Sequence, residues 1–124
     1  MTIPIRIVAG ATTLEGEFFD TACGRAVAGI LPIEVRPHEW GDEFYFEVPL
    51  EMELDESATT AVKVGDIGYW PPGAALAIFF GPTPLSAGSD PVPASAVNLV
   101  GRITSDARDL KKEKGAQKIR IERV

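Results

Sequence analysis

Hydrophobic and polar residues alternate along several short stretches of the chain, a pattern typical of β-strands that are buried on one face. The first stretch runs from Ile3 to Val8, and a break at Gly10 separates it from a second at 14–19, so the two form a predicted hairpin. Further stretches with strand character follow at 33–37, 44–48, 51–55, 74–80, 97–103 and 119–124. The pattern therefore predicts about eight short strands.

Two segments have helical character instead. Residues 21–31 begin at a potential capping residue, Thr21, carry an apolar face and end before Pro32. A second short helix is predicted at 106–112. Many short strands separated by glycine and proline turns indicate a mainly-β fold, either a sandwich or a closed barrel. Neither a repeat nor a linker divides the sequence, so we expect a single domain over residues 1–124.

Composition supports a globular chain. Its 124 residues are 45% hydrophobic and 24% charged, which is sufficient for one buried core. The one cysteine, Cys23, permits no internal disulfide and no thiolate zinc cluster, and this usage fits a reducing compartment. We find no signal-peptide pattern and no apolar run long enough to cross a membrane. A cytoplasmic location without membrane association is the expectation.

Charge is distributed unevenly. The net charge of −6 arises from −9 over residues 1–104 and +3 over residues 105–124. An acidic body argues against nucleic acid as a partner, because phosphates require clustered lysine and arginine. The basic segment Lys111–Lys114 is interpreted as the solvated end of the second helix.

Acidic residues between 51 and 56 are the first candidates for site chemistry. Glu51, Glu53 and Asp55 alternate with apolar residues, as on an exposed strand, and the segment lacks the spacing of a calcium loop. His38 lies between Pro37 and Glu39 in a predicted loop, where a solvated side chain is expected. We therefore predict no metal site and no cofactor.

Two aromatic and proline-rich blocks carry a resemblance to a known family. These blocks are LPIEVRPHEWGDEFYFEVP (31–49) and VGDIGYWPPGAALAIFFGPTP (64–84). They closely resemble a prokaryotic family of small cyclophilin-like proteins of undefined function, and Asn98 to Ile103 is similar to a later strand of that family. The resemblance implies a closed eight-stranded β-barrel with two short helices capping the ends.

The resemblance also allows a comparison with prolyl isomerases, in which an arginine hydrogen-bonds the substrate amide. When the stretch 44–49 is aligned with that site, Phe46 occupies the arginine position, whereas Phe80 matches the phenylalanine of the proline pocket. The expected tryptophan and histidine partners are missing. We therefore predict a cyclophilin-like fold with no catalytic residues, leaving Arg36 or Arg102 as the arginines able to reach the groove from another strand.

The predicted function is a non-catalytic binding module for a small molecule or a proline-containing peptide. Because neighbouring strand residues point to opposite faces, one of Phe79 and Phe80 is expected in the core and the other in the groove. Core packing of the aromatic residues is the competing interpretation. The residues proposed for the ligand groove are Tyr45, Trp70, Phe80, Phe46, Tyr69, Trp40 and Glu43.

Two other functional classes stay open at this stage. The chain is a candidate subunit of a larger enzyme assembly or of a homo-oligomer, since related barrels occur as domains of multi-subunit carboxamide-processing enzymes. A weak prolyl isomerase, or an unrelated enzyme that uses His38, Asp42 or Glu43, is the other alternative.

Overall fold

The computed structural model describes residues 1–124 and is mainly β, as predicted. The strands are β1 (Ile3–Ala9), β2 (Thr12–Phe18), β3 (Ile33–Val35), β4 (His38–Glu39), β5 (Glu43–Glu47), β6 (Ala58–Thr59), β7 (Asp66–Trp70), β8 (Ala75–Phe79), β9 (Val97–Ile103) and β10 (Ile119–Arg123). The helices are α1 (Ala22–Gly29), a single turn η1 (Pro71–Gly73) and a 3-10 helix η2 (Ala107–Glu113).

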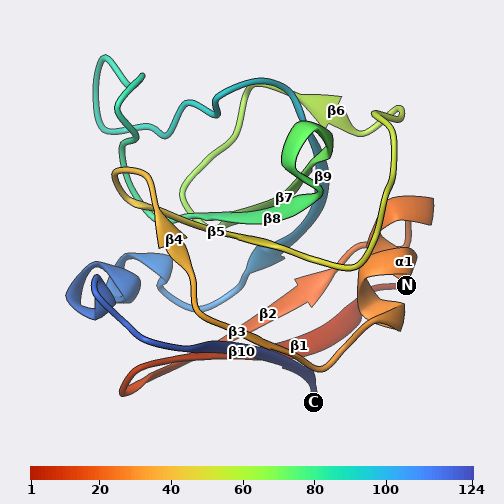
Figure 1. The fold of residues 1–124 in the computed structure, drawn as a ribbon, viewed down its shortest axis with the longest axis horizontal. Coiled ribbons are helices and arrows are strands. Elements are labelled where there is room, and N and C mark those ends of the chain that lie inside the picture. The colour runs from red at the N-terminus through yellow and green to blue at the C-terminus, as the bar shows by residue number, and fades with distance from the viewer.

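All strands belong to one curled antiparallel sheet, which is shown in Figure 1. Nine strands follow one another in the order β3-β10-β1-β2-β9-β7-β8-β5-β4, and β6 pairs with β9. The sheet is open, so the prediction of a closed eight-stranded barrel is wrong in this respect. The predicted strand 33–37 is interrupted at Arg36 and Pro37, and proline has no amide to donate to a ladder. As a result β3 pairs with β10 and β4 pairs with β5, and these two strands form the edges of the sheet.

The predicted strand at 51–55 is also wrong, because this segment has no regular secondary structure. Two buried side chains hold it against the sheet instead. The Tyr69 hydroxyl donates to the carbonyl oxygen of Leu50, and the Asn98 side-chain oxygen accepts from the backbone N–H of Asp55 at 2.9 Å. Side chains of the core thus replace the ladder that a strand would form.

The main core lies on the inner face of the curled sheet. It contains 23 buried residues, drawn from the strands, from α1 and from η2. Cys23 and Val27 of α1 are fully buried in it, and burial raises the pKa of the Cys23 thiol. Thr21 caps α1 as predicted, since its side-chain oxygen accepts from the Gly24 N–H at 3.0 Å.

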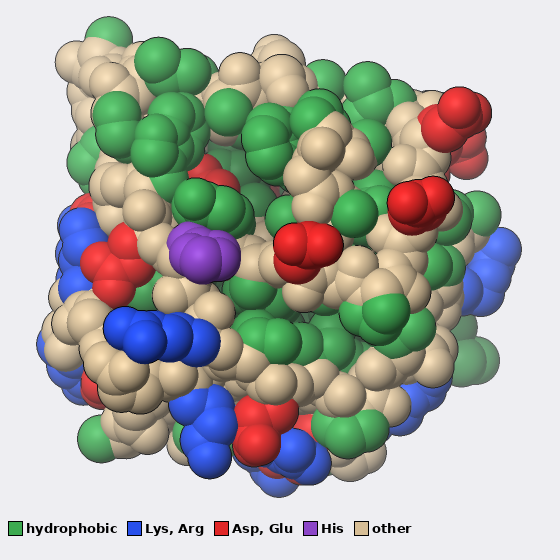
Figure 2. Space-filling view, viewed as in Figure 1, with side chains coloured by type: hydrophobic (Ala, Val, Ile, Leu, Met, Phe, Trp, Pro, Cys, Tyr) green, Lys and Arg blue, Asp and Glu red, His purple; other side chains and the backbone are tan.

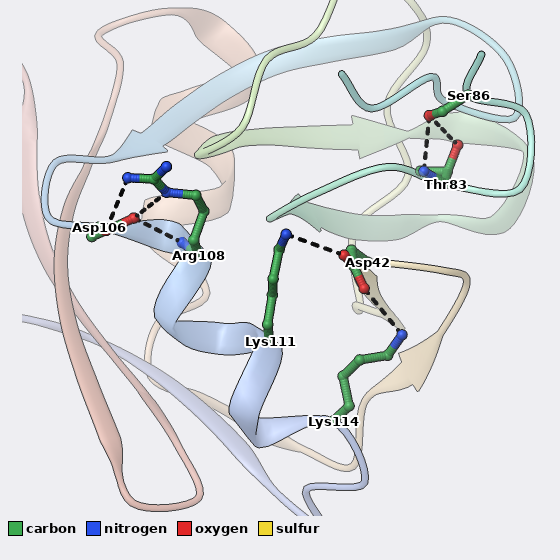
Figure 3. A network of polar contacts seen from close by, with 7 residues as sticks. All are labelled: Asp42, Thr83, Ser86, Asp106, Arg108, Lys111 and Lys114. Carbon is green, nitrogen blue, oxygen red and sulfur yellow. Dashed lines mark hydrogen bonds and ion pairs between the residues drawn. The ribbon is translucent and has the colours of Figure 1, made fainter. Parts of the chain in front are cut away.

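The helices α1 and η2 lie at opposite ends of the curled sheet (Figure 1), and both contribute residues to the main core. Two lysines attach η2 to the turn between β4 and β5: Lys114 Nζ lies 3.1 Å and Lys111 Nζ 3.7 Å from carboxylate oxygens of Asp42 (Figure 3). Asp106 caps the start of η2 by accepting from the Arg108 N–H. None of the helices has the length and apolar character required to span a membrane.

Candidate functional site

An apolar pocket lies on the outer face of the sheet, over β5, β7 and β8. It encloses about 150 Å³. The side chains that line it are mostly aromatic or small and apolar, with one carboxylate among them. They are Trp40, Glu43, Tyr45, Trp70, Ala77, Phe79, Pro93, Ala94 and Val97.

The register of the sheet explains the base of the pocket. Glu43 on β5 is paired with Phe79 on β8, and Tyr45 is paired with Ala77. Ala77 is in turn paired with Gly68 on β7. Directly paired residues share one face of a sheet, so all five lie on the outer face. The small side chain of Ala77 leaves space that a larger residue would fill, and the absence of a side chain at Gly68 makes room for Val97.

Two tryptophans form walls of the pocket from different parts of the chain. Trp40 lies in the turn between β4 and β5, and its backbone N–H donates to the Glu43 carbonyl at 3.0 Å. Gly41 follows with φ +61°, and a Cβ there would lie 2.9 Å from the Pro82 carbonyl, so the turn needs glycine. Trp70 ends β7, and its indole N–H donates to the Ser95 hydroxyl at 2.7 Å.

A loop at 85–96 forms the third side of the pocket through Pro93 and Ala94. Side-chain hydrogen bonds hold this loop at both ends. The Thr83 hydroxyl donates to the Val92 carbonyl, and the Thr83 N–H donates to the Ser86 hydroxyl at 2.9 Å (Figure 3). Together with the bond between Trp70 and Ser95, these contacts fix the loop over the outer face of the sheet.

Glu43 is the one carboxylate of the pocket. Its side chain is 7% exposed, and its Oε1 atom is buried with no hydrogen-bond partner. Burial raises the pKa of this carboxyl from about 4.5 to about 7, because the ionised form loses its hydration without gaining a charged partner. The pocket therefore combines a large apolar surface with one unsatisfied acidic group.

The structure brings four of the predicted groove residues together and separates the others from them. Trp40, Glu43, Tyr45 and Trp70 all line the pocket. Phe46, Tyr69 and Phe80 are instead buried in the main core. The reason is the alternation along β5, β7 and β8, which turns these three side chains to the inner face.

Phe79, rather than Phe80, is the phenylalanine of the pocket. The Phe80 ring packs inside the sheet against Phe44, with ring centroids 4.8 Å apart. The pairing of Glu43 with Phe79 determines that Phe79 faces outward and Phe80 inward. The sequence does not show how distant strands pair, so it could not indicate this choice. Contributions from Ala77, Pro93, Ala94 and Val97 were likewise not predicted.

Comparison with known proteins agrees with this architecture. The profile of a family described as cyclophilin-like matches residues 3–122. The chain belongs to the cyclophilin-like family. Among solved structures, it is similar to the solution structure of the hypothetical protein AF2241 from Archaeoglobus fulgidus, with 35% identity and a TM-score of 0.80. That match covers 99% of this chain and 95% of the other, whereas no curated protein matches. The predicted family is thereby confirmed.

The pocket of this cyclophilin-like protein is lined by neither of the arginines considered from the sequence. Arg102 lies on β9, and its Nε donates to Glu17 at 3.0 Å. Arg36 is not among the lining residues either. His38 is exposed and packs on Tyr45, with ring centroids 5.2 Å apart.

Figure 2 shows how charge is arranged on one face of the cyclophilin-like protein. Lysine and arginine side chains lie in the lower half and at the margins, and hydrophobic side chains gather in the upper half. Seven of the twelve lysine and arginine residues of the chain lie within residues 105–124, the segment that contains η2 and β10. The chain as a whole carries a net charge of −6, so the long-range field favours cations over anions.

Proposed function

We propose that this cyclophilin-like protein is a binding module whose pocket takes a small molecule. The observation that carries the proposal is the apolar cavity of about 150 Å³ with a single carboxyl group in its lining. Ligand sites are commonly concave and apolar, with a few polar groups that fix the orientation of the ligand. An apolar cavity of this size accommodates a group about as large as a benzene ring.

The lining residues favour binding over catalysis. Glu43 is the one acid among them, and histidine, cysteine, serine, lysine and arginine do not occur in the set. Acid–base and nucleophilic mechanisms normally combine at least two such groups in contact. The pocket instead offers apolar area and one carboxyl, which suits recognition.

Benzene is a direct probe of the proposal. We expect it to shift the methyl NMR signals of Ala77, Ala94 and Val97, while core methyls such as those of Ile5 and Ile121 stay unchanged. Saturable shifts confined to the pocket methyls would support a binding site. If neither saturating benzene nor a short-chain amine, alcohol or carboxylate moves these signals, the proposed function is wrong.

Trp70→Ala tests whether the wall of the pocket contributes to binding. Trp70 is only partly buried and lies outside the main core, so the variant should keep its circular dichroism spectrum. We expect its affinity for benzene to fall about tenfold or more, since a large aromatic contact is lost. A variant that unfolds, or that binds benzene as tightly as the parent, would contradict the role given to Trp70.

A proline-containing peptide is the second candidate ligand, since a proline ring is about as large as benzene and the aromatic side chains of Tyr45 and Trp70 line the pocket. Exchange NMR on a short Ala-Pro peptide with the protein present tests this class. Pocket shifts without accelerated cis–trans exchange would favour peptide binding, and accelerated exchange would favour a prolyl isomerase.

A further inference from the structure

The protein supplies no hydrogen-bond donor to one oxygen of the Glu43 carboxyl group. Its Oε1 atom is buried and receives no hydrogen bond. Buried polar atoms in native proteins are nearly always satisfied, because an unpaired one costs about 1–3 kcal/mol. Because Glu43 lines the pocket, a ligand bound there is positioned to supply a donor to its carboxyl group.

The nearest basic side chains on the neighbouring helix are already engaged. Lys111 and Lys114 pair with Asp42, the residue before Glu43. Burial alone accounts for the raised pKa of Glu43, and no cation offsets it. The ionised carboxylate is therefore left without a counter-charge, which a cationic ligand would supply.

The aromatic side chains of the pocket are also suited to binding a positively charged ligand. Trp40, Tyr45 and Trp70 contribute three aromatic rings to the lining of the pocket. Tryptophan and tyrosine attract ammonium groups over their ring faces, most strongly when the groups are desolvated. Aromatic rings beside a carboxylate thus offer both the apolar contacts and the electrostatic attraction that a substituted ammonium group uses.

We propose that the pocket binds a free, low-molecular-weight alkylammonium compound, which donates an N–H to the Glu43 carboxylate and packs its alkyl groups against the aromatic walls. This inference rests on the proposed function and specifies its ligand class. Carboxylate ligands are disfavoured because they would face Glu43 with a like charge. Neutral alcohols satisfy the orphan acceptor but supply no counter-charge.

Three probes with the same carbon skeleton separate these ligand classes: isobutylamine, isobutyl alcohol and isobutyrate. An alkylamine titrates near the lysine value of about 10.4, so at about pH 8 it is cationic and the Glu43 carboxyl is mostly ionised. Affinities are obtained from the methyl shifts of Ala77, Ala94 and Val97. We expect isobutylamine to bind roughly tenfold or more tightly than the alcohol, and isobutyrate to bind weakest.

Glu43→Gln keeps the shape of the side chain and removes its charge. We expect this variant to bind isobutylamine roughly tenfold more weakly and the alcohol with little change. Glu51→Gln removes the same charge outside the pocket and serves as the matched control. It should leave all three affinities within about twofold of the parent, since exposed charges are screened by solvent.

The outcomes distinguish the two proposals. Preference for the amine that disappears in Glu43→Gln supports the alkylammonium site. Equal or tighter binding of the alcohol overturns that site but leaves a small-molecule pocket. If benzene and all three probes leave the pocket methyls unmoved, the proposed function fails as well. The parent protein alone shows whether any probe binds and whether the amine is preferred, so both overturning results can be obtained without the variant, which only assigns the preference to Glu43.

Discussion

At the scale of single residues, the protonation of Glu43 makes the stability of the folded protein depend on pH. Its pKa is about 7 in the folded protein and about 4.5 when exposed, so the folded state binds this proton more tightly. Its contribution to stability is therefore fully present below about pH 4.5 and is lost as pH rises through about 7. The shift corresponds to roughly 3 kcal/mol.

Urea unfolding of the parent and Glu43→Gln measures this contribution. We expect the free energy of unfolding of the parent to fall relative to the variant by up to about 3 kcal/mol between pH 5 and 8. The difference between the two proteins removes the titration of other groups, such as Asp66, whose pKa is also raised by burial. A difference that does not change with pH would show that Glu43 is solvated or paired in solution.

Tyr69 and Tyr45 lie on opposite faces of the sheet, and the same substitution is expected to have different effects at the two positions. The Tyr69 hydroxyl bonds Leu50 and Met52, whereas the Tyr45 hydroxyl makes no hydrogen bond within the protein. Tyr69→Phe should cost about 1–3 kcal/mol and raise amide hydrogen exchange at Met52, since two backbone groups lose their partner. Tyr45→Phe is the control and should change stability by less than about 0.5 kcal/mol. Equal effects would contradict the assigned faces.

At the scale of elements, β7 and β9 meet closely beneath the pocket. A Cβ added at Gly68 would lie 2.7 Å from Val97 Cγ2, and Val97 lines the pocket. Gly68→Ala should therefore displace Val97 into the cavity, destabilise the fold by about 1–3 kcal/mol and weaken benzene binding.

Gly29→Ala is the matched control for this substitution. A Cβ at Gly29 meets nothing within 4 Å, and the residue ends α1. We expect this variant to gain up to about 1 kcal/mol in urea unfolding and to bind benzene like the parent. Unchanged benzene binding by Gly68→Ala would mean that Val97 moves away from the pocket instead.

Some of these elements could be predicted from the sequence, and others could not. Alternation of apolar and other residues predicted β1, a high content of strand-forming residues predicted β5, and the cap and apolar face predicted α1. The segment 51–55 alternates in the same way, yet it is fixed by Tyr69 and Asn98, because side-chain bonds between distant residues leave no local pattern. For the same reason Phe79 could not be chosen over Phe80: the choice depends on pairing with Glu43.

At the scale of the whole molecule, the two edge strands of the open sheet are consecutive in the chain, and η2 lies beside the turn that follows them. Asp42 is the charged link between this turn and η2. Because both lysines are substantially exposed, Asp42→Asn should cost no more than about 1 kcal/mol.

Urea unfolding of Asp42→Asn at low and high salt checks this expectation. The small loss should shrink further at about 1 M salt, where the screening length is about 3 Å. A loss above about 2 kcal/mol, independent of salt, would show that Asp42 holds the fold together through its backbone turn rather than through charge.

Both tryptophans of the chain, Trp40 and Trp70, line the same cavity. Tryptophan fluorescence, excited at wavelengths where tyrosine does not absorb, therefore reports on this one cavity. A ligand that enters should alter the emission directly. During heating, the emission should follow the loosening of the 85–96 loop from Trp70, while far-ultraviolet circular dichroism follows the sheet. Separate midpoints in the two signals would mean that the binding surface melts before the scaffold that carries it.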